Sequence, residues 1–147
     1  MASNPPRIGV VVLNWNGLDH LRELLPSLYA SQYPDFFVVV VDNGSRDASV
    51  EWMRREYPDT ELLALGENRR FSGGNNAGAA RALELGAEVL LLLNNDTTVA
   101  PDFLQWLGRS FQEDAELGVA GSRICYYDRL ERIWYGGGKI LAERPAG

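Results

Sequence analysis

The feature that most constrains this chain is a repeated pairing of an apolar run with a polar ending. Four short segments have this form: IGVVVL, FFVVVV, ELLAL and VLLLL, each followed by a cluster rich in Asn, Asp, Glu or Gly. Short apolar runs bounded by turn-forming residues are typical of buried strands. We therefore predict strands over Ile8–Leu13 and within the segments DFFVVVVD, TELLALGEN and AEVLLLLNND.

Amphipathic segments separate these runs. Apolar residues recur at helical spacing in LDHLRELLPSLYASQ, where Pro26 is expected to kink or shorten the helix. We predict further helices in ASVEWMRREYP, ending before Pro58, in SGGNNAGAARALELG after its glycines, and in APDFLQWLGRSFQED. Gly86 suits the left-handed position that follows a helix, and Pro101 with Asp102 suits a helix start.

Strands that alternate with helices indicate an α/β fold with a mostly parallel sheet covered on both faces. Two further strands are predicted in LGVAGSRICYYD and RIWYGGGKI, paired as a hairpin around Asp128-Arg129. We find no linker, internal repeat or low-complexity segment, so residues 1–147 are predicted to form a single domain. The carboxyl ends of parallel strands meet at one edge of the sheet, where ligands gather. The polar clusters at 14–17, 42–47, 67–76 and 94–97 should therefore converge there.

Charge and composition exclude several functions. The net charge of −6 argues against non-specific electrostatic binding to nucleic acid or to an anionic membrane. A single cysteine, Cys125, excludes an internal disulfide, and a single histidine, His20, excludes a His-rich zinc site. His20 lies among charged residues and is interpreted as a solvated helix residue. No run is long enough to span a bilayer, and MASNPPR does not resemble a signal peptide. We expect a cytoplasmic protein, with peripheral attachment at the inner face of the membrane left open.

Asp42 closes a run of four valines and has two interpretations. Asn43-Gly44 is a strong turn signal, so Asp42 suits a turn or a cap. A carboxylate at the shared edge also suits contact with a nucleotide base or ribose. Convergence of the clusters favours the second interpretation.

The glycine-rich segment FSGGNNAG suits an anion site of a general kind. No Gly-Lys-Ser/Thr follows, so it is not a P-loop, and it lacks the G-x-G-x-x-G order of a dinucleotide fingerprint. Gly73 and Gly74 allow close approach of the backbone, and the following helix N-terminus offers N–H groups to phosphate. Arg69 and Arg70 precede them and carry charge of the right sign.

Asn94-Asn95-Asp96 is the sharpest signal in the sequence. Mg²⁺ and Mn²⁺ are often held by one or two carboxylates together with substrate phosphates. Asp96 lies at the end of a predicted strand, where it suits that task. The two amides add hydrogen-bonding capacity without adding negative charge.

Together these segments resemble the family 2 glycosyltransferases, which have the GT-A fold, a three-layer α/β/α arrangement. The resemblance rests on VVVLNWNG, VVVVDNGSRDAS, ENRRFSGGNNAGAARAL, LLLLNNDTTVAPDFL and GSRICYYDRLERIWYGGGKI, in that order. The branch most similar to the chain includes bacterial rhamnosyltransferases and related enzymes of cell-surface polysaccharide synthesis. This resemblance implies transfer of a sugar, with inversion, from a nucleotide diphosphate donor (UDP-, dTDP- or GDP-linked) to a saccharide or lipid-linked acceptor.

The same resemblance implies roles for individual residues. The residues expected to bind the nucleotide-sugar are Asn14, Asn16, Asp42, Asn43, Arg69, Gly74, Asn76, Asn94 and Asn95. Asp42 would contact the base, and Asp96 would hold a divalent metal, Mn²⁺ or Mg²⁺. Asn94 stands where the family's D-x-D motif has its first Asp. Two carboxylates would be expected to bind a metal more tightly than this arrangement.

A general base is not identified in the sequence. In the family this carboxylate lies further downstream, so we expect a chain truncated relative to the family, with its acceptor segment absent. Glu113-Asp114 is interpreted as a solvated helix end. Four aromatic residues near the end of the chain are candidates for a surface that a C-terminal half or a second copy covers, with a core role as an equal alternative: Tyr126, Tyr127, Trp134 and Tyr135. A non-catalytic nucleotide-sugar-binding module and a nucleotidyltransferase remain alternative functions.

Overall fold

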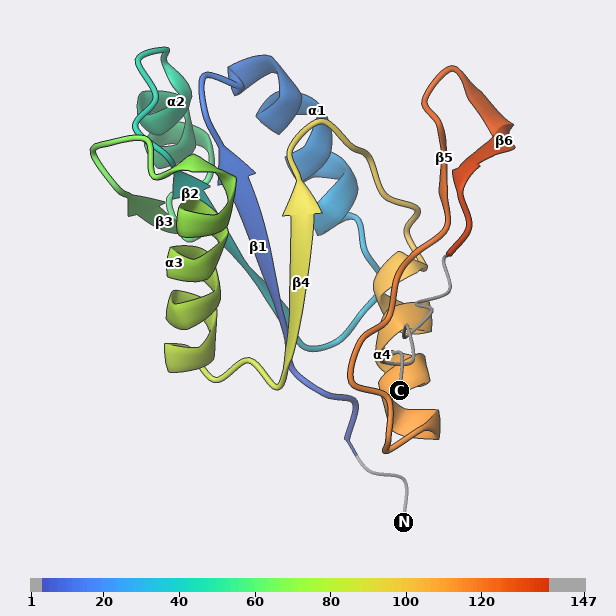
Figure 1. Ribbon diagram of the computed structural model, residues 1–147. Helices are drawn as coiled ribbons and strands as arrows, with labels where there is room; N and C mark the ends of the chain where they lie inside the picture. Colours follow the sequence, from blue (N-terminus) through green and yellow to red (C-terminus); the bar gives the residue numbers. More distant parts are fainter. Residues whose placement is uncertain (1–3, 138–147) are drawn as a thin grey trace, which may run out of the picture. The chain divides into compact units, whose positions relative to one another are not determined.

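The computed structural model describes residues 4–137, which belong to two compact units with a boundary between Ala115 and Glu116 (Figure 1). The first unit contains the helices and the parallel sheet, and the second contains a hairpin. Within the described range, no helix combines the length and hydrophobicity that a membrane crossing requires.

The first unit is built on a parallel four-stranded sheet, as the sequence predicts. Its strands are β1 (Ile8–Asn14), β2 (Phe36–Asp42), β3 (Glu61–Ala64) and β4 (Val89–Asn94), in the spatial order β3-β2-β1-β4. Its helices are α1 (Leu18–Tyr29), α2 (Ser49–Glu56), α3 (Arg70–Glu84) and α4 (Phe103–Glu113). The α/β class with a mostly parallel sheet is thereby confirmed.

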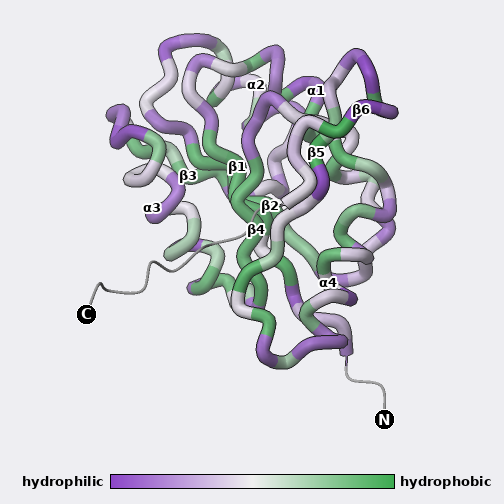
Figure 2. Tube along the Cα trace, turned by 45° about the vertical axis from the view of Figure 1, so that its right-hand side comes forward, coloured by the Kyte–Doolittle hydropathy of each residue, from purple (hydrophilic) through white to green (hydrophobic). Residues whose placement is uncertain are grey.

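Two hydrophobic cores lie on the two faces of this sheet. On one face, Val10 and Val12 of β1 pack with leucines of α1, with Met53 of α2 and with Leu104 of α4. On the other face, the intervening valines of β1 and β2 pack against α3. Because successive side chains of a strand point to opposite faces, a strand covered on both sides must be apolar throughout. Figure 2 shows these hydrophobic strands beside the more hydrophilic loops that follow their carboxyl ends.

The helix α3 begins earlier than predicted. We expected it to start after the glycines, but Gly73 and Gly74 lie inside it. Gly74 and Gly78 are buried against the sheet, and a Cβ atom on Gly78 would lie 2.6 Å from the Val41 Cγ2 atom. These two glycines therefore bring the helix backbone close to the valines of the sheet. Gly86 follows the helix with φ of 89°, the predicted left-handed conformation.

The strand β4 is less buried than expected. It pairs with β1 alone among the described residues, and alternate side chains are exposed. Leu91 and Leu93 pack against the larger core, whereas Leu90 is 37% and Leu92 is 54% exposed on the face that carries α3. The prediction of a wholly buried strand is therefore wrong, because α3 covers β1 and β2 more fully than β4.

The second unit contains an antiparallel hairpin of β5 (Ile124–Tyr126) and β6 (Arg129–Tyr135). Its turn falls at the predicted position, next to Asp128-Arg129. The expected strand over LGVAG is absent: residues 117–121 form neither helix nor strand. The predicted continuation of the second strand beyond residue 137 lies outside the described residues. The four aromatic side chains named above are all exposed, by 39 to 67%.

Candidate functional site

The carboxyl ends of β1, β2 and β4 form a rim of polar side chains, as predicted. Asn14 is fully buried there, and its side chain joins the three strands. Its Nδ2 group donates to Asp42 Oδ1 at 3.4 Å and to Ser45 Oγ at 3.3 Å. Its Oδ1 atom accepts from Asn95 Nδ2 at 2.9 Å. Asn14 therefore fixes the strand ends relative to one another.

Asp42 serves the turn that follows β2. Its Oδ2 atom accepts from the Ser45 N–H at 3.0 Å, and the residue is only 4% exposed. The hydrogen bond from Ser45 agrees with the interpretation of Asp42 as a turn residue. Contact between Asp42 and a nucleotide base stays a prediction.

Asn16 connects the first turn to the second. Its backbone is left-handed, with φ of 51°, a conformation that Asn tolerates better than most residues. Its N–H donates to Ser45 Oγ at 2.9 Å, and its Oδ1 atom accepts from the Arg46 N–H at 2.7 Å. Asn16 thereby holds the two loops together.

Asn43 ties β2 to the start of α3. It is 2% exposed, and its Oδ1 atom accepts from the Arg69 N–H at 2.8 Å. Its Nδ2 group donates to Asn68 Oδ1 at 3.1 Å and to the Arg70 carbonyl at 3.2 Å. With these bonds its side chain supports the loop. The Arg69 guanidinium lies 3.5 Å from the Glu67 carboxylate, so its charge has a local partner.

Asp47 links the first turns of two helices. Its carboxylate accepts from the Leu18 N–H at the start of α1 and from the Ser49 N–H at the start of α2, both at 3.1 Å. Partial burial would raise the pKa of Asp47, but the hydrogen bonds from Ser49 and Leu18 outweigh it and hold the pKa below its ordinary value. The loops of the rim are thus anchored by an ionised carboxylate.

A cleft of about 400 Å³ opens at this rim. It is lined by Leu13, Trp15, Asn16, Gly17, His20, Phe71, Asn94, Asn95 and Asp96. Of the predicted site residues, the rim contains Asn14 and Asp42 and the cleft contains Asn16 and the Asn94–Asp96 segment. Arg69, Gly74 and Asn76 are not among the residues that line the cleft: Gly74 is buried on the side of α3 that faces the sheet, and Asn76 is exposed on that helix.

Three cleft residues are missing from the sequence prediction. Trp15 is 57% and Phe71 is 63% exposed, so both rings are accessible to a ligand in the cleft. His20 is exposed on α1, as expected, but it also lines the cleft. The sequence does give one signal for the two aromatic residues, which is their position. Trp15 lies between Asn14 and Asn16, and Phe71 lies two residues before the first glycine of the glycine-rich segment.

The Asn94-Asn95-Asp96 segment presents alternate side chains to solvent. Asn95 is held inward by Asn14, whereas Asn94 and Asp96 are exposed and their side chains have no hydrogen bond or ion pair within residues 4–137. No group of three or more His, Cys, Asp or Glu side chains in that range could hold a metal alone. One free carboxylate beside a free amide fits a divalent cation that completes its coordination with phosphate oxygens and water.

The chain is similar in sequence to several known proteins. An uncharacterized glycosyltransferase of Nostoc is 30% identical over 116 residues, which are 77% of this chain and 35% of that protein. The O-antigen biosynthesis protein RfbC of Myxococcus xanthus is 31% identical over 125 residues, 82% of this chain and 10% of that protein. The chain thus spans about a third or less of the length of these relatives.

A solved structure shares the fold. The mannosyltransferase PcManGT of Pyrobaculum calidifontis, in complex with GDP-Man and Mn²⁺, aligns with a TM-score of 0.57 at 25% identity. The alignment covers 75% of this chain and 32% of that one, and the expected GT-A fold is confirmed. In sequence, residues 9–144 match the family described as Glycosyl transferase family 2. By this match, which extends over nearly all of its length, the chain belongs to glycosyl transferase family 2.

Proposed function

We propose that this chain binds a nucleotide diphosphate-sugar at the rim of the sheet and transfers the sugar, with inversion, to a hydroxyl group of a saccharide or lipid-linked acceptor. The observation that carries the proposal is the cleft in which Asp96 and Asn94 present unpaired oxygens beside two exposed aromatic rings. Such a site offers a cation-binding group to a diphosphate and stacking surfaces to a base or a sugar.

The residues of the rim would divide the work of donor binding. Asp96, with Asn94, would hold a divalent cation together with the donor's diphosphate. The cation would neutralise the charge that develops on the nucleoside diphosphate as it leaves. Trp15 or Phe71 would pack against the donor, and Asp42 is the proposed contact for its base. Asn14 and Asn95 would keep these groups in place.

The comparisons support this assignment of ligand. The mannosyltransferase was solved with a nucleotide diphosphate-sugar and Mn²⁺, the class of donor and the metal proposed for this chain. The relative from Myxococcus xanthus is named for O-antigen biosynthesis, which suits a polysaccharide product.

A second candidate is a module that binds the donor without turnover. Transfer with inversion requires a base that accepts the proton of the acceptor hydroxyl. Among the cleft-lining side chains of the described range, only His20 and Asp96 carry an imidazole or a carboxyl group, and Asp96 is assigned to the cation. Glu113 lies at the end of α4, paired with Arg109 at 2.6 Å, and is not part of the cleft.

Calorimetric titration tests donor binding. UDP, dTDP and GDP are each titrated into the chain with and without Mn²⁺, and into the variants Asp96→Asn and Glu113→Gln. We expect one nucleotide to bind with Mn²⁺ and to bind at least about tenfold more weakly to Asp96→Asn, because a charge-assisted contact is lost. Glu113→Gln removes an equally exposed carboxylate elsewhere and should bind like the unmodified chain. Absence of binding by all three nucleotides, or equal binding to both variants, would refute the proposal.

Product analysis separates the enzymatic candidates. Incubation with the matching nucleotide-sugar and a saccharide acceptor should release a nucleoside diphosphate. Release of pyrophosphate in a separate incubation with a nucleoside triphosphate and a sugar 1-phosphate would instead identify a nucleotidyltransferase. Donor binding without release of either product would favour the binding module.

A further inference from the structure

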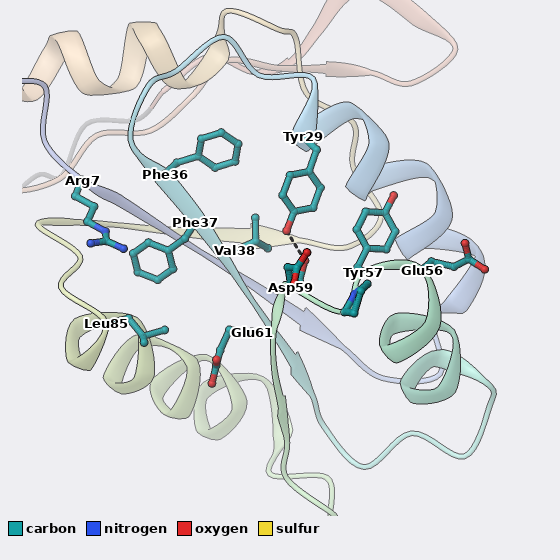
Figure 3. Close-up of a pocket in the computed structure, with 12 residues that line it drawn as sticks. Arg7, Tyr29, Phe36, Phe37, Val38, Glu56, Tyr57, Asp59, Glu61 and Leu85 are labelled. Carbon is teal, nitrogen blue, oxygen red and sulfur yellow. Dashed lines mark hydrogen bonds between the residues drawn. The ribbon is translucent and has the colours of Figure 1, made fainter.

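A second pocket lies at the opposite, amino end of the sheet (Figure 3). It exists because β3 is short: its first residue, Glu61, pairs with Val39, whereas β2 begins three residues earlier at Phe36. Among the described residues, the stretch 36–38 has no strand beside it on this edge. The resulting notch has a volume of about 550 Å³, within the range of small-molecule sites.

The backbone of β2 offers polar groups to this notch. The Asp35 carbonyl accepts from the Ile8 N–H at 3.0 Å and so faces β1. Because the polar groups of successive residues in a strand point to alternate sides, the N–H and C=O groups of Phe36 face the notch. They supply one donor and one acceptor that no neighbouring strand uses.

Aromatic side chains form walls on both faces of the sheet. Phe36 and Phe37 are neighbours in β2 and point to opposite faces. On one face the Tyr29 ring stacks on the Tyr57 ring at 5.5 Å and lies 6.3 Å from the Phe36 ring. Tyr29 is nevertheless 42% exposed, so part of this aromatic wall is open to a ligand.

The charged residues of the notch are mostly paired. Arg7 lies 3.7 Å from Asp35 and stacks over the Phe37 ring at 4.9 Å. Glu61 pairs with Arg81 at 2.8 Å.

Two acidic residues complete the lining. Glu56 pairs with Arg55 at 2.7 Å, whereas Asp59 is exposed and has no hydrogen bond or ion pair within residues 4–137. A phosphate or another anion would meet this free carboxylate and be repelled. A neutral molecule with many hydroxyl groups would instead donate hydrogen bonds to it.

We propose that this notch is a second binding site, specific for a neutral saccharide. Sugar hydroxyls would donate to Asp59 and to the Phe36 carbonyl, and the C–H face of a sugar ring would pack against Tyr29 and Phe36. The further suggestion that this saccharide is part of the acceptor or product rests on the function proposed above. The site itself is independent of donor binding, since it lies at the other end of the sheet.

The test is a titration of the ¹⁵N-labelled chain, followed by NMR, with maltotriose and with methyl α-D-mannopyranoside. We expect the amide signals of Phe36, Val38 and Thr60 to shift, with a dissociation constant on the order of 1 mM. Asp59→Asn should weaken this binding at least about tenfold, because the charged acceptor is lost. Glu113→Gln is the matched control and should bind as the unmodified chain does.

Three results would overturn the inference: no shift with either sugar, shifts confined to the cleft at Asn94 and Asp96, or equal binding to Asp59→Asn. Titration with UDP-glucose distinguishes the sources of the sugar. If the notch accepts the donor's own sugar, its amides shift with UDP-glucose as well, and if it accepts only acceptor saccharide, they do not. If calorimetry detects no donor binding, the notch amides should still shift when saccharide is added. The saccharide site and the proposed function can therefore be refuted independently of each other.

Discussion

Gly17 has no side chain, and the hydrogen bonds of the rim depend on that space. A Cβ atom at this position would clash with the Asn95 side-chain amide and would lie 2.7 Å from Asn14 Oδ1. Those two atoms belong to the hydrogen bond that joins the end of β1 to the segment after β4. Any larger residue must therefore displace the side chains of Asn95 and Asn14 from their present positions.

Gly17→Ala is expected to break the hydrogen bond between Asn95 and Asn14. We expect a loss of unfolding free energy of about 1 to 3 kcal/mol, because buried polar groups lose their partners. Nucleotide affinity in the presence of Mn²⁺ should fall in parallel, as measured by calorimetry. Gly118→Ala is the control, since a Cβ there meets nothing within 4 Å. Unchanged affinity and stability in Gly17→Ala would show that the rim does not depend on this contact.

The hydrogen bonds of Asp47 should make the free energy of unfolding depend on pH in the acid range. The pKa of Asp47 is lowered in the folded chain from its ordinary value of 3.8. A carboxylate whose pKa is lowered by folding stabilises the protein above its unfolded pKa, and this stabilisation disappears as pH falls through the folded pKa. Asp47→Asn should therefore cost about 1 kcal/mol at pH 7, because the amide keeps only one of the two accepting oxygens, and less below pH 3.8. Urea unfolding at several pH values measures this difference, and a difference that does not change with pH would contradict the assignment.

The side chains that converge at the rim could be predicted, because parallel strands place their carboxyl ends together whatever the loops do. The sequence alone could not predict which of these side chains would be buried in hydrogen bonds and which would face solvent. Asn43 and Asn94 look alike in sequence, yet one is buried in a hydrogen-bond network and the other faces solvent. That difference depends on which side of the strand end each loop leaves, and this is set by packing between distant segments.

The position of helix α3 depends on its glycines. Gly74 and Gly78 lie on the face that packs against β1 and β2, so the helix approaches the sheet more closely than side chains would permit. The sequence alone predicts a loop at the first glycines, because glycine is a poor helix former. Close packing against the sheet outweighs that local preference.

Gly78→Ala should force α3 away from Val11 and Val41. Overpacking of a well-packed interface lowers the free energy of unfolding by about 1 to 3 kcal/mol. This loss exceeds the gain from the higher helix propensity of alanine. Thermal and urea unfolding measure the loss. Ala80→Ser, at an exposed position of the same helix, serves as the control. A stabilised Gly78→Ala chain would mean that α3 does not approach the sheet as closely as described.

The strands of the sheet were predictable because each apolar run has the right length and a polar ending. The exposure of Leu90 and Leu92 could not be predicted. An apolar strand has the same sequence pattern whether helices cover one face of the sheet or both. The failed strand over LGVAG has a similar origin, because a short apolar stretch becomes a strand only where a neighbour pairs with it.

For the whole chain, the junction of the two units is the expected point of cleavage. Residues 114–123 form neither helix nor strand and are largely exposed, as sites of limited proteolysis usually are. Brief digestion with a protease specific for glutamate should cut after Glu113 or Glu116 and leave the first unit intact. Mass spectrometry of the fragments checks this, and calorimetry tests whether the fragment retains nucleotide binding. Rapid cleavage within α1 or α3 instead would contradict the division into units.

The spatial order of the strands also sets an order of events during synthesis. The sheet is extended outward from β1, and β2 and β3 can join it as soon as they leave the ribosome. Of the four strands of the parallel sheet, β4 comes last in the sequence, yet it pairs with β1, the first. Until it emerges, Asn14 has no Asn95 to bind and the segment that carries Asp96 does not exist. A nascent chain can therefore pair β1, β2 and β3 before the cleft at the rim is complete, because Asn94, Asn95 and Asp96 are the last of its lining residues to be synthesised.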